Sequence, residues 1–493
     1  MSGPLGGLLL VLAAIAVGSL VAFRPTWALG AALLTPLVII CSRWSGTVAV
    51  LLLLWGGMKY GAFALLPSLG GALAQTEVVL VLLVLLFTVL KLSRREVQLS
   101  RAVGPYTVFG VFVGLSLLSW AVNEGTLLAL FAGIRSLATL PILALAAVVL
   151  GTERDMKLLM RGGVALTFAQ VPLAYLQVLT GGASKDVDLV NGTLGLGGAN
   201  LLGIWMLAAF GGCFYLFVRR GGLRWLVAAA AFSSVIAIAG ARLSIIGVPI
   251  VLVGLGIMAA LRPHVRSAAE RLTAGLVVLG FVAVVAVSVM YAGYARSGQR
   301  IGTAVQDLNP SSLLARQSQI GDYSVPRVAY VTYGWDFLQR QSRVPLLGTG
   351  PATAGSGSAS ASSPDYQSAP FAVGLRLKSQ GLATYYSSAS VVTVTSQLVS
   401  SLVEYGPVGL LLLLVFYATV GLRGMRSLWR REDPWLIEEA LTGTLPVFLT
   451  FATIGTVYGV TWEGLNIIAL GLWWCVILSG ALGGVGVRGE QVG

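Results

Sequence analysis

Apolar residues run in long, nearly unbroken stretches along this chain, and polar residues are confined to short breaks and to one long exception. A run of about 18 to 25 apolar residues has the length of an α-helix that crosses a membrane, whereas a strand of a membrane barrel needs only about ten alternating residues. The pattern therefore predicts an all-α polytopic integral membrane protein with about 14 spanning helices. These runs cover residues 5–23, 27–42, 46–67, 77–93, 103–122, 126–150, 163–181, 199–218, 225–241, 243–261, 272–294, 395–421, 437–460 and 465–486.

The exception is a polar segment from about Arg296 to Val394, the one long piece of the chain that could lie in water. It divides the chain into N-terminal helices at 1–294, a large loop at 295–394 and C-terminal helices at 395–493. We expect the loop to be partly helical.

Composition agrees with a membrane protein. Hydrophobic residues make up 56% of the 493 residues and charged residues only 10%, and the mean hydropathy is +0.87, which is far outside the range of soluble domains. The formal charge of +13 sits in clusters between helices, as orientation in a bilayer requires, so it indicates no nucleic-acid partner. We interpret the first apolar run as a spanning helix and not as a removed signal.

The basic clusters predict the orientation of the chain. If the predicted helices alternate from a cytoplasmic N-terminus, every cluster falls on the cytoplasmic side, and the large loop faces outward. The C-terminus is then also cytoplasmic. The clusters are Arg94-Arg95, Arg154/Lys157/Arg161, Arg219/Arg220/Arg224, Arg262/Arg266/Arg271 and Arg423/Arg426/Arg430/Arg431. Shorter outward connections are expected at 67–75, 123–125 and 182–199.

Cysteine and histidine offer little chemistry. The cysteines Cys41, Cys213 and Cys475 lie in or beside apolar runs without a CxxC spacing, so we expect neither a disulfide framework nor a zinc site, and no cofactor. The single histidine, His264, lies in a basic loop predicted to be cytoplasmic.

Three charged residues inside or beside apolar runs are candidates for function. Arg242 lies between two apolar runs near the outward boundary, where it could bind a phosphate with two hydrogen bonds or simply extend to the interface. Arg135 lies deeper in its run and could join the same anion site or pair with Glu404. Glu404 opens the helix that follows the loop, and it could accept a proton or serve as a structural partner of an arginine.

The first half of the loop combines aromatic and charged residues. We expect an amphipathic helix at about 325–340 that carries Arg327, Tyr330, Trp335, Asp336 and Arg340. Such a face could stack sugars and bond their hydroxyls, or it could lie on the membrane surface. A turn follows at Pro345–Pro351. Further candidate substrate-binding residues in the loop are Arg300, Arg316, Arg376, Lys378 and Tyr385, and Asp365 is a further candidate base.

Asn191-Gly192-Thr193 fits the pattern of a glycosylation acceptor, but this pattern is common by chance. The glycines of this region favour backbone turns that re-enter the membrane.

Four motifs in order give the chain a resemblance to a known family. They are Gly192-Thr193 with Asn200-Leu201-Leu202-Gly203, then Ala241-Arg242-Leu243-Ser244, then Arg327 with Trp335 and Pro345-Leu346-Leu347-Gly348-Thr349-Gly350-Pro351, and finally Glu404-Tyr405-Gly406-Pro407-Val408-Gly409. Their order around one large outward loop resembles the O-antigen ligase and O-antigen polymerase superfamily over roughly residues 190 to 420.

The resemblance implies an inverting, metal-independent membrane glycosyltransferase of the GT-C type in the bacterial cytoplasmic membrane. Its donor would be a glycan on undecaprenyl diphosphate, and a chain-length regulator protein is a possible partner. By resemblance, Arg242 and Arg327 correspond to two arginines that hold the diphosphate. This agrees with the chemistry, since two guanidinium groups can stabilise the charge of a departing diphosphate.

The sequence departs from the ligase pattern at one point. Ligases carry a His-Asn pair where this chain has Thr395-Ser396. This favours a polymerase that joins lipid-linked repeats, with Asp336, Asp365 or Glu404 as the remaining candidate bases. A ligase with another acceptor stays an alternative, as do a transporter of lipid-linked glycans and a non-catalytic scaffold.

Overall fold

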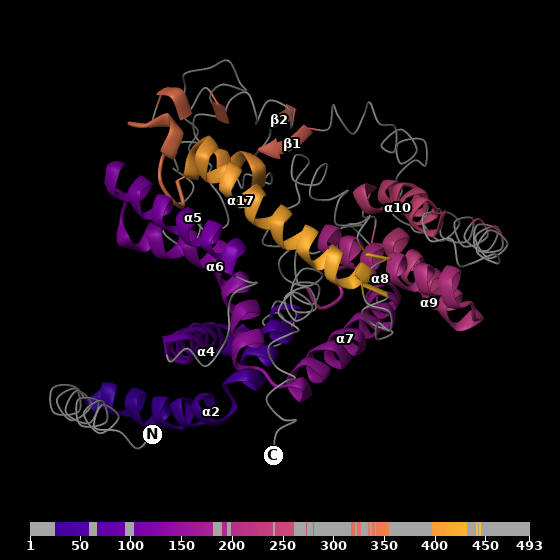
Figure 1. Cartoon of the computed structure of the whole chain (residues 1–493), viewed down its shortest axis with the longest axis horizontal. Helices are drawn as coiled ribbons and strands as arrows, with labels where there is room; N and C mark the ends of the chain where they lie inside the picture. Colours follow the sequence, from indigo (N-terminus) through magenta and orange to yellow (C-terminus); the bar gives the residue numbers. More distant parts are fainter. Residues whose placement is uncertain are drawn as a thin grey trace.

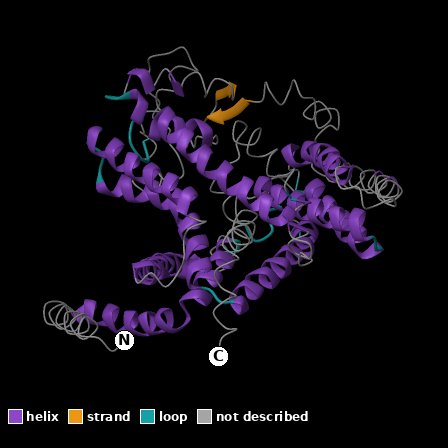
Figure 2. Ribbon diagram, in the orientation of Figure 1, coloured by secondary structure: helices purple, strands orange, loops and turns teal. Residues whose placement is uncertain are grey.

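The computed structural model describes residues 25–58, 67–93, 103–180, 190–194, 199–239, 242–260, 273, 280, 317–320, 323–326, 334–335, 338–340, 342–353, 397–430, 440–441 and 443–444. Most of these residues form long α-helices (Figures 1 and 2). Within the described ranges, six helices are long and apolar enough to cross a membrane. The chain is therefore a helical membrane protein, which confirms the predicted class. The count of about 14 spans and the orientation in the membrane stay predictions.

Nine long helices lie within the described residues. In chain order they are α2 (Pro25–Gly56), α4 (Pro67–Ser93), α5 (Val103–Val122), α6 (Leu127–Leu150), α7 (Glu153–Leu179), α8 (Ala199–Arg220), α9 (Leu223–Ile238), α10 (Arg242–Ala260) and α17 (Gln397–Arg430). The predicted runs at 103–122, 126–150 and 199–218 match α5, α6 and α8 within two residues at each end. The runs at 272–294 and 465–486 lie largely or wholly outside the described residues.

The predicted runs at 27–42 and 46–67 differ from the structure. Residues 27–42 and 46–67 were expected as two helices, but they form one element, α2, which is interrupted at Trp44 (φ −128°, ψ 36°) and ends at Gly56. The next helix, α4, begins at Pro67. Residues 67–75, expected as a connection, are therefore the first turns of α4, ahead of the candidate span at Thr76–Ser93. Proline is well suited to the first position of a helix, where its missing N–H costs nothing.

The start of α7 was also misplaced by the apolar pattern. The helix begins at Glu153, before the expected 163, because Thr152 and Asp155 form a capping box at its N-terminus. Asp155 also accepts a hydrogen bond of 2.5 Å from Thr47 Oγ1 of α2. The cap therefore ties α7 to α2. The two elements approach closely because Gly46 has no side chain. A Cβ at Gly46 would lie only 2.6 Å from the Cα of Gly151.

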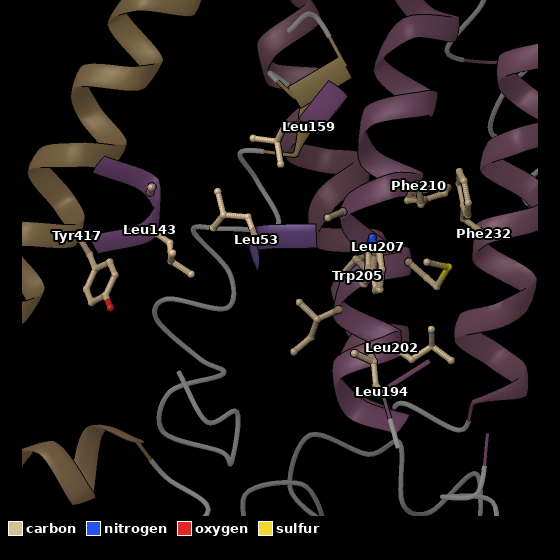
Figure 3. Packing of buried hydrophobic residues seen from close by; sticks show 14 of the residues in the cluster. Leu53, Leu143, Leu159, Leu194, Leu202, Trp205, Leu207, Phe210, Phe232 and Tyr417 are labelled. Carbon is tan, nitrogen blue, oxygen red and sulfur yellow. The ribbon is translucent and has the colours of Figure 1, made fainter. Parts of the chain in front are cut away.

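The core is centred on α8, the most buried of the six spans. It packs against α9, α10 and α7. Figure 3 shows Leu202, Trp205, Leu207 and Phe210 of α8 in this cluster, with Phe232 of α9 beside Phe210. Trp205 Nε1 donates to Thr167 Oγ1 of α7 at 2.9 Å, so the one polar atom of this indole is satisfied inside the core.

The described part of the loop contains a short antiparallel hairpin, which the apolar pattern did not predict. It consists of β1 (Gln317–Ile320) and β2 (Tyr323–Pro326), with Gln317 paired to Pro326 and Ile320 to Tyr323. The predicted helix at 325–340 is therefore wrong at its start. Further along, 334–335 and 338–340 are helical, with Leu338 buried and Trp335 44% exposed, as an amphipathic helix requires.

Candidate functional site

The helix that follows the loop, α17, is broken at Gly406, which has φ 69° and ψ 176°. Pro407 comes next, and proline has no N–H to donate to the carbonyl four residues earlier. The carbonyl of Val403 therefore loses its helical hydrogen-bond donor. The non-helical backbone at Gly406 also interrupts the regular hydrogen bonds of the helix next to Glu404. A carbonyl left open inside a protein must find another donor.

The donors come from residues 342–353, here called the docked segment. The backbone N–H of Thr349 donates to the carbonyl of Val403 at 2.8 Å, and that of Gly350 donates to the carbonyl of Glu404 at 3.0 Å. The hydroxyl of Thr349 also donates to Val403, at 3.0 Å. The turn predicted at Pro345–Pro351 is confirmed, and a single 3₁₀ turn at Pro345–Leu347 delivers these donors to the break. Figure 1 shows the docked segment beside the start of α17.

Two glycines make this contact possible. A Cβ at Gly348 (φ 83°) would lie 2.4 Å from the carbonyl oxygen of Glu404, and one at Gly406 would lie 2.2 Å from that of Leu346. Both glycines also adopt positive φ, which other residues rarely do. The Gly-Thr-Gly of one motif and the Glu-Tyr-Gly-Pro of the other therefore fit together backbone against backbone.

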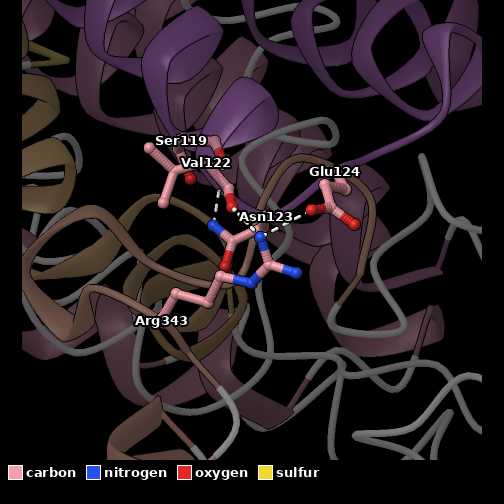
Figure 4. A network of polar contacts seen from close by, with 5 residues as sticks. All are labelled: Ser119, Val122, Asn123, Glu124 and Arg343. Atoms are coloured by element: carbon pink, nitrogen blue, oxygen red, sulfur yellow. Dashed lines mark hydrogen bonds and ion pairs between the residues drawn. The ribbon is translucent and has the colours of Figure 1, made fainter.

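The turn between α5 and α6 holds the docked segment from the other side. Asn123 Nδ2 donates to the carbonyl of Gly348 at 3.1 Å, and the hydroxyl of Ser342 donates to the same oxygen. The guanidinium of Arg343 donates to Glu124 at 2.8 Å and to the carbonyl of Val122 at 3.2 Å (Figure 4). Hydrogen bonding and charge attraction from Arg343 lower the pKa of the exposed Glu124 carboxyl.

Residues of α5 and α6 complete the site. Tyr405 of α17 packs against Phe112 of α5 with ring centroids 5.1 Å apart. On α6, a Cβ at Gly133 would lie 2.6 Å from Pro351 Cβ and 3.1 Å from Tyr405 Oη. Helix α6 therefore approaches both the docked segment and α17 at one point. Arg135, the candidate anion ligand of α6, follows Gly133 by two residues.

Glu404 lies at the centre of this junction and is only 2% exposed. The carboxyl group that the sequence singled out thus lies in the part of α17 that the docked segment fixes. Acids inside a protein are rare, so a buried acid at a helix break is a candidate for chemistry.

The other predicted site residues are spread over the chain. Arg242 is the first residue of α10, and Trp335 and Arg340 lie in the two short helical pieces of the loop, both exposed. The described contacts of Trp335 and Arg340 do not reach the junction, and the side chains of Arg242 and Arg135 lie outside the described part. The remaining candidates lie outside the described residues, namely Arg300, Arg316, Arg327, Tyr330, Asp336, Asp365, Arg376, Lys378 and Tyr385.

A second polar cluster, which the sequence analysis missed, holds residues 190–194 against α7. Gln170 donates to Thr193 Oγ1 at 2.8 Å and accepts from Thr193 N at 2.9 Å. Gln177 accepts from the N–H groups of Asn191 and Gly192, both at 2.9 Å. The two glutamines are seven residues apart and so lie on one face of the helix. Asn191 is 6% exposed, which leaves no room for a glycan on its side chain. The expectation of a turn that re-enters the membrane stays a prediction.

An apolar cavity of about 130 Å³ lies between α7, α8, α9 and residues 440–444. Its wall includes Phe168, Trp205 and Phe232. It lies apart from the junction, and its lining is apolar except for Thr167, Cys213 and Thr444. Within the described residues, no cluster of three or more His, Cys, Asp or Glu side chains could hold a metal ion.

Compared with known proteins, the chain matches no family model and no curated sequence. The fold and the site therefore define its class, a helical membrane protein with a loop segment docked on a broken helix.

Proposed function

We propose that the protein is a membrane glycosyltransferase that polymerises oligosaccharide repeats carried on undecaprenyl diphosphate, on the outer face of the bacterial cytoplasmic membrane. The observation that carries the proposal is the junction between the docked segment and α17. It joins two of the motifs on which the resemblance rests, although they are far apart in the chain. If each motif were only a loop turn or a helix end, it would form its hydrogen bonds without the other motif.

The proposed reaction transfers a growing glycan between two lipid carriers. A hydroxyl oxygen of the acceptor repeat forms a bond to the anomeric carbon of the donor, and the bond from that carbon to the diphosphate oxygen breaks. The diphosphate leaves with the electron pair, and the hydroxyl proton passes to a base. No oxidant or reductant is needed, and the configuration at the anomeric carbon inverts because attack and departure are on opposite faces.

The chain offers groups for each part of this reaction. Arg242 and Arg327 are proposed to hold the diphosphate, because a guanidinium can bond two phosphate oxygens at once and stays charged in a site of low polarity. Glu404 is the best-supported of the three candidate bases, since it is buried at the junction. Asp336 and Asp365 remain alternatives for the same role.

The test uses the purified full-length chain in lipid nanodiscs with an undecaprenyl-diphosphate-linked repeat, and product length is read from gels. Arg242→Ala and Arg327→Ala should each lower the rate of polymer formation by about 100-fold or more. The lysine variants should lose less activity, because lysine keeps the positive charge but cannot form two parallel hydrogen bonds to a phosphate. Arg224→Ala is the matched control, because this arginine stacks on Trp225 at 4.8 Å, away from the junction.

Two results would assign another function. If a fluorescent lipid-linked repeat crosses the membrane and no polymer forms, the protein is a transporter. If the glycan appears only on a lipid A core or a protein acceptor, it is a ligase. Polymer formation that neither arginine substitution changes would contradict the proposed site.

A further inference from the structure

The contacts around Gly348 link the α5–α6 turn to Val403 of α17 through a single peptide group. The carbonyl of Gly348 and the N–H of Thr349 belong to the same peptide unit, which is planar and trans, so they point in opposite directions. Asn123 Nδ2 holds the oxygen at 3.1 Å, and the N–H reaches Val403 at 2.8 Å on the other side. Fixing the oxygen therefore aims the N–H at α17.

Asn123 is itself held in one orientation. Its Nδ2 donates to the carbonyl of Ser119 at 2.8 Å as well as to Gly348, so both protons of the amide are used. Both partners are carbonyl oxygens, so only the nitrogen of the amide can face them. Figure 4 shows Asn123 beside Ser119 at the end of α5. An aspartate in this place would have the same shape and no proton to donate.

The next peptide carries the effect to Glu404. The N–H of Gly350 donates to the carbonyl of Glu404 at 3.0 Å, and Gly350 follows Thr349 directly. The side chain of Tyr405 is meanwhile held by Phe112. The backbone of α17 on the N-terminal side of the break is thus fixed by donors that depend on Asn123.

We infer that Asn123 is a positioning residue for Glu404, acting through the peptide between Gly348 and Thr349. The structural part of this inference stands on the contacts alone, and the catalytic part rests on the proposed function. The competing explanation is that α17 fixes Glu404 by itself and that Asn123 only adds stability to the α5–α6 turn.

The first arm of the test measures amide hydrogen exchange at Thr349 and Gly350 in the full-length chain. Asn123→Asp should speed exchange at both by at least about fivefold, since one hydrogen bond of ordinary strength is lost. Ser342→Ala, which removes the other donor to Gly348, should give a smaller increase and serves if Asn123→Asp does not fold. Ser233→Ala is the matched control, because that hydroxyl donates to a carbonyl of its own helix.

The second arm is a double-mutant cycle on polymer formation. If Asn123 acts through Glu404, Asn123→Asp lowers kcat by about tenfold or more in the wild-type background, and it has little further effect on Glu404→Gln. If Asn123 only stabilises the turn, its effect is the same in both backgrounds.

The outcomes separate the two claims. Unchanged exchange at Thr349 and Gly350 in both variants would overturn the structural part, and independent effects in the cycle would overturn the catalytic part. A wild-type chain that makes no polymer would contradict the proposed function and leave the exchange result standing.

Discussion

The backbone N–H of Gly350 lies 3.0 Å from the carbonyl oxygen of Glu404 and donates to it across a break in α17. The same break leaves Val403 without its helical partner, and Thr349 supplies the missing donor. A proline in a membrane helix usually has its freed carbonyl satisfied by a neighbouring side chain or water. Here a loop backbone takes that place, so the loop and the helix hold each other in register.

The first prediction concerns the glycines of this contact. Gly348→Ala should lower the stability of the protein by more than about 3 kcal/mol, because positive φ and a clash with the Glu404 backbone add together. Gly350→Ala is the matched control in the same segment. It has φ 105°, but its nearest neighbour is the Asn123 side chain at 3.8 Å, so it should show only the strain of about 1–2 kcal/mol.

Thermal unfolding of the two variants in the same detergent measures the difference. Equal losses for Gly348→Ala and Gly350→Ala would mean that the backbone contact with α17 is not as close as the structure shows. A loss of exchange protection at Gly350 only in Gly348→Ala would support the contact independently.

The second prediction concerns acid and the ion pair of Glu124 with Arg343. Arg343 lowers the pKa of Glu124, so the carboxylate contributes stability above the unfolded value of about 4.3. That contribution is lost as the pH falls through the lower folded value. Both side chains are exposed, at 73% for Glu124 and 59% for Arg343. The effect should therefore be small and weaken further with salt.

The measurement is the melting temperature between about pH 3 and pH 7 at low and high salt. Glu124→Gln should lower it slightly at neutral pH and remove part of its fall below about pH 4.3. Glu153→Gln gives a control, because Glu153 pairs with Lys157 on the surface of one helix and makes no contact with the loop. If the melting temperature of Glu124→Gln follows the same pH profile as that of the wild type, the ion pair contributes nothing to stability.

The sequence predicted the helices better than their contacts. Apolar runs located α5, α6 and α8 because a membrane helix must be apolar along its whole length. The start of α7 was missed because a capping box, not hydrophobicity, sets it. The docked segment could not be predicted as a partner of α17, since two of its bonds to α17 come from backbone N–H groups, which nearly every residue has. Gly348, Gly406 and Pro407 were the only signs of it, and each alone fits an ordinary turn.

The same limit applies to the candidate site. Glu404 was found because a carboxylate beside an apolar run is unusual. Asn123 was not found, because asparagine is common in short turns and its presence there indicates no special role. Its role follows only from the two carbonyl oxygens that its amide meets.

The last prediction concerns the two glutamines that hold residues 190–194. Gln170→Leu should lower stability by about 1–3 kcal/mol, because it leaves the partly buried Thr193 N–H without its acceptor. Gln177→Leu should have a similar effect, since it removes the acceptor of two N–H groups. Thr180→Val is the control, because Thr180 is exposed and its hydroxyl donates within its own helix.

A chemical probe tests the location of the turn itself. In an otherwise cysteine-free chain, Asn191→Cys should react slowly with a maleimide, because the position is only 6% exposed. Adding Gln177→Leu should raise the reaction rate about fivefold or more, since the turn loses the acceptor that holds both its N–H groups. Fast labelling in the single variant would place residue 191 at the surface and would contradict a turn that is inserted between the helices.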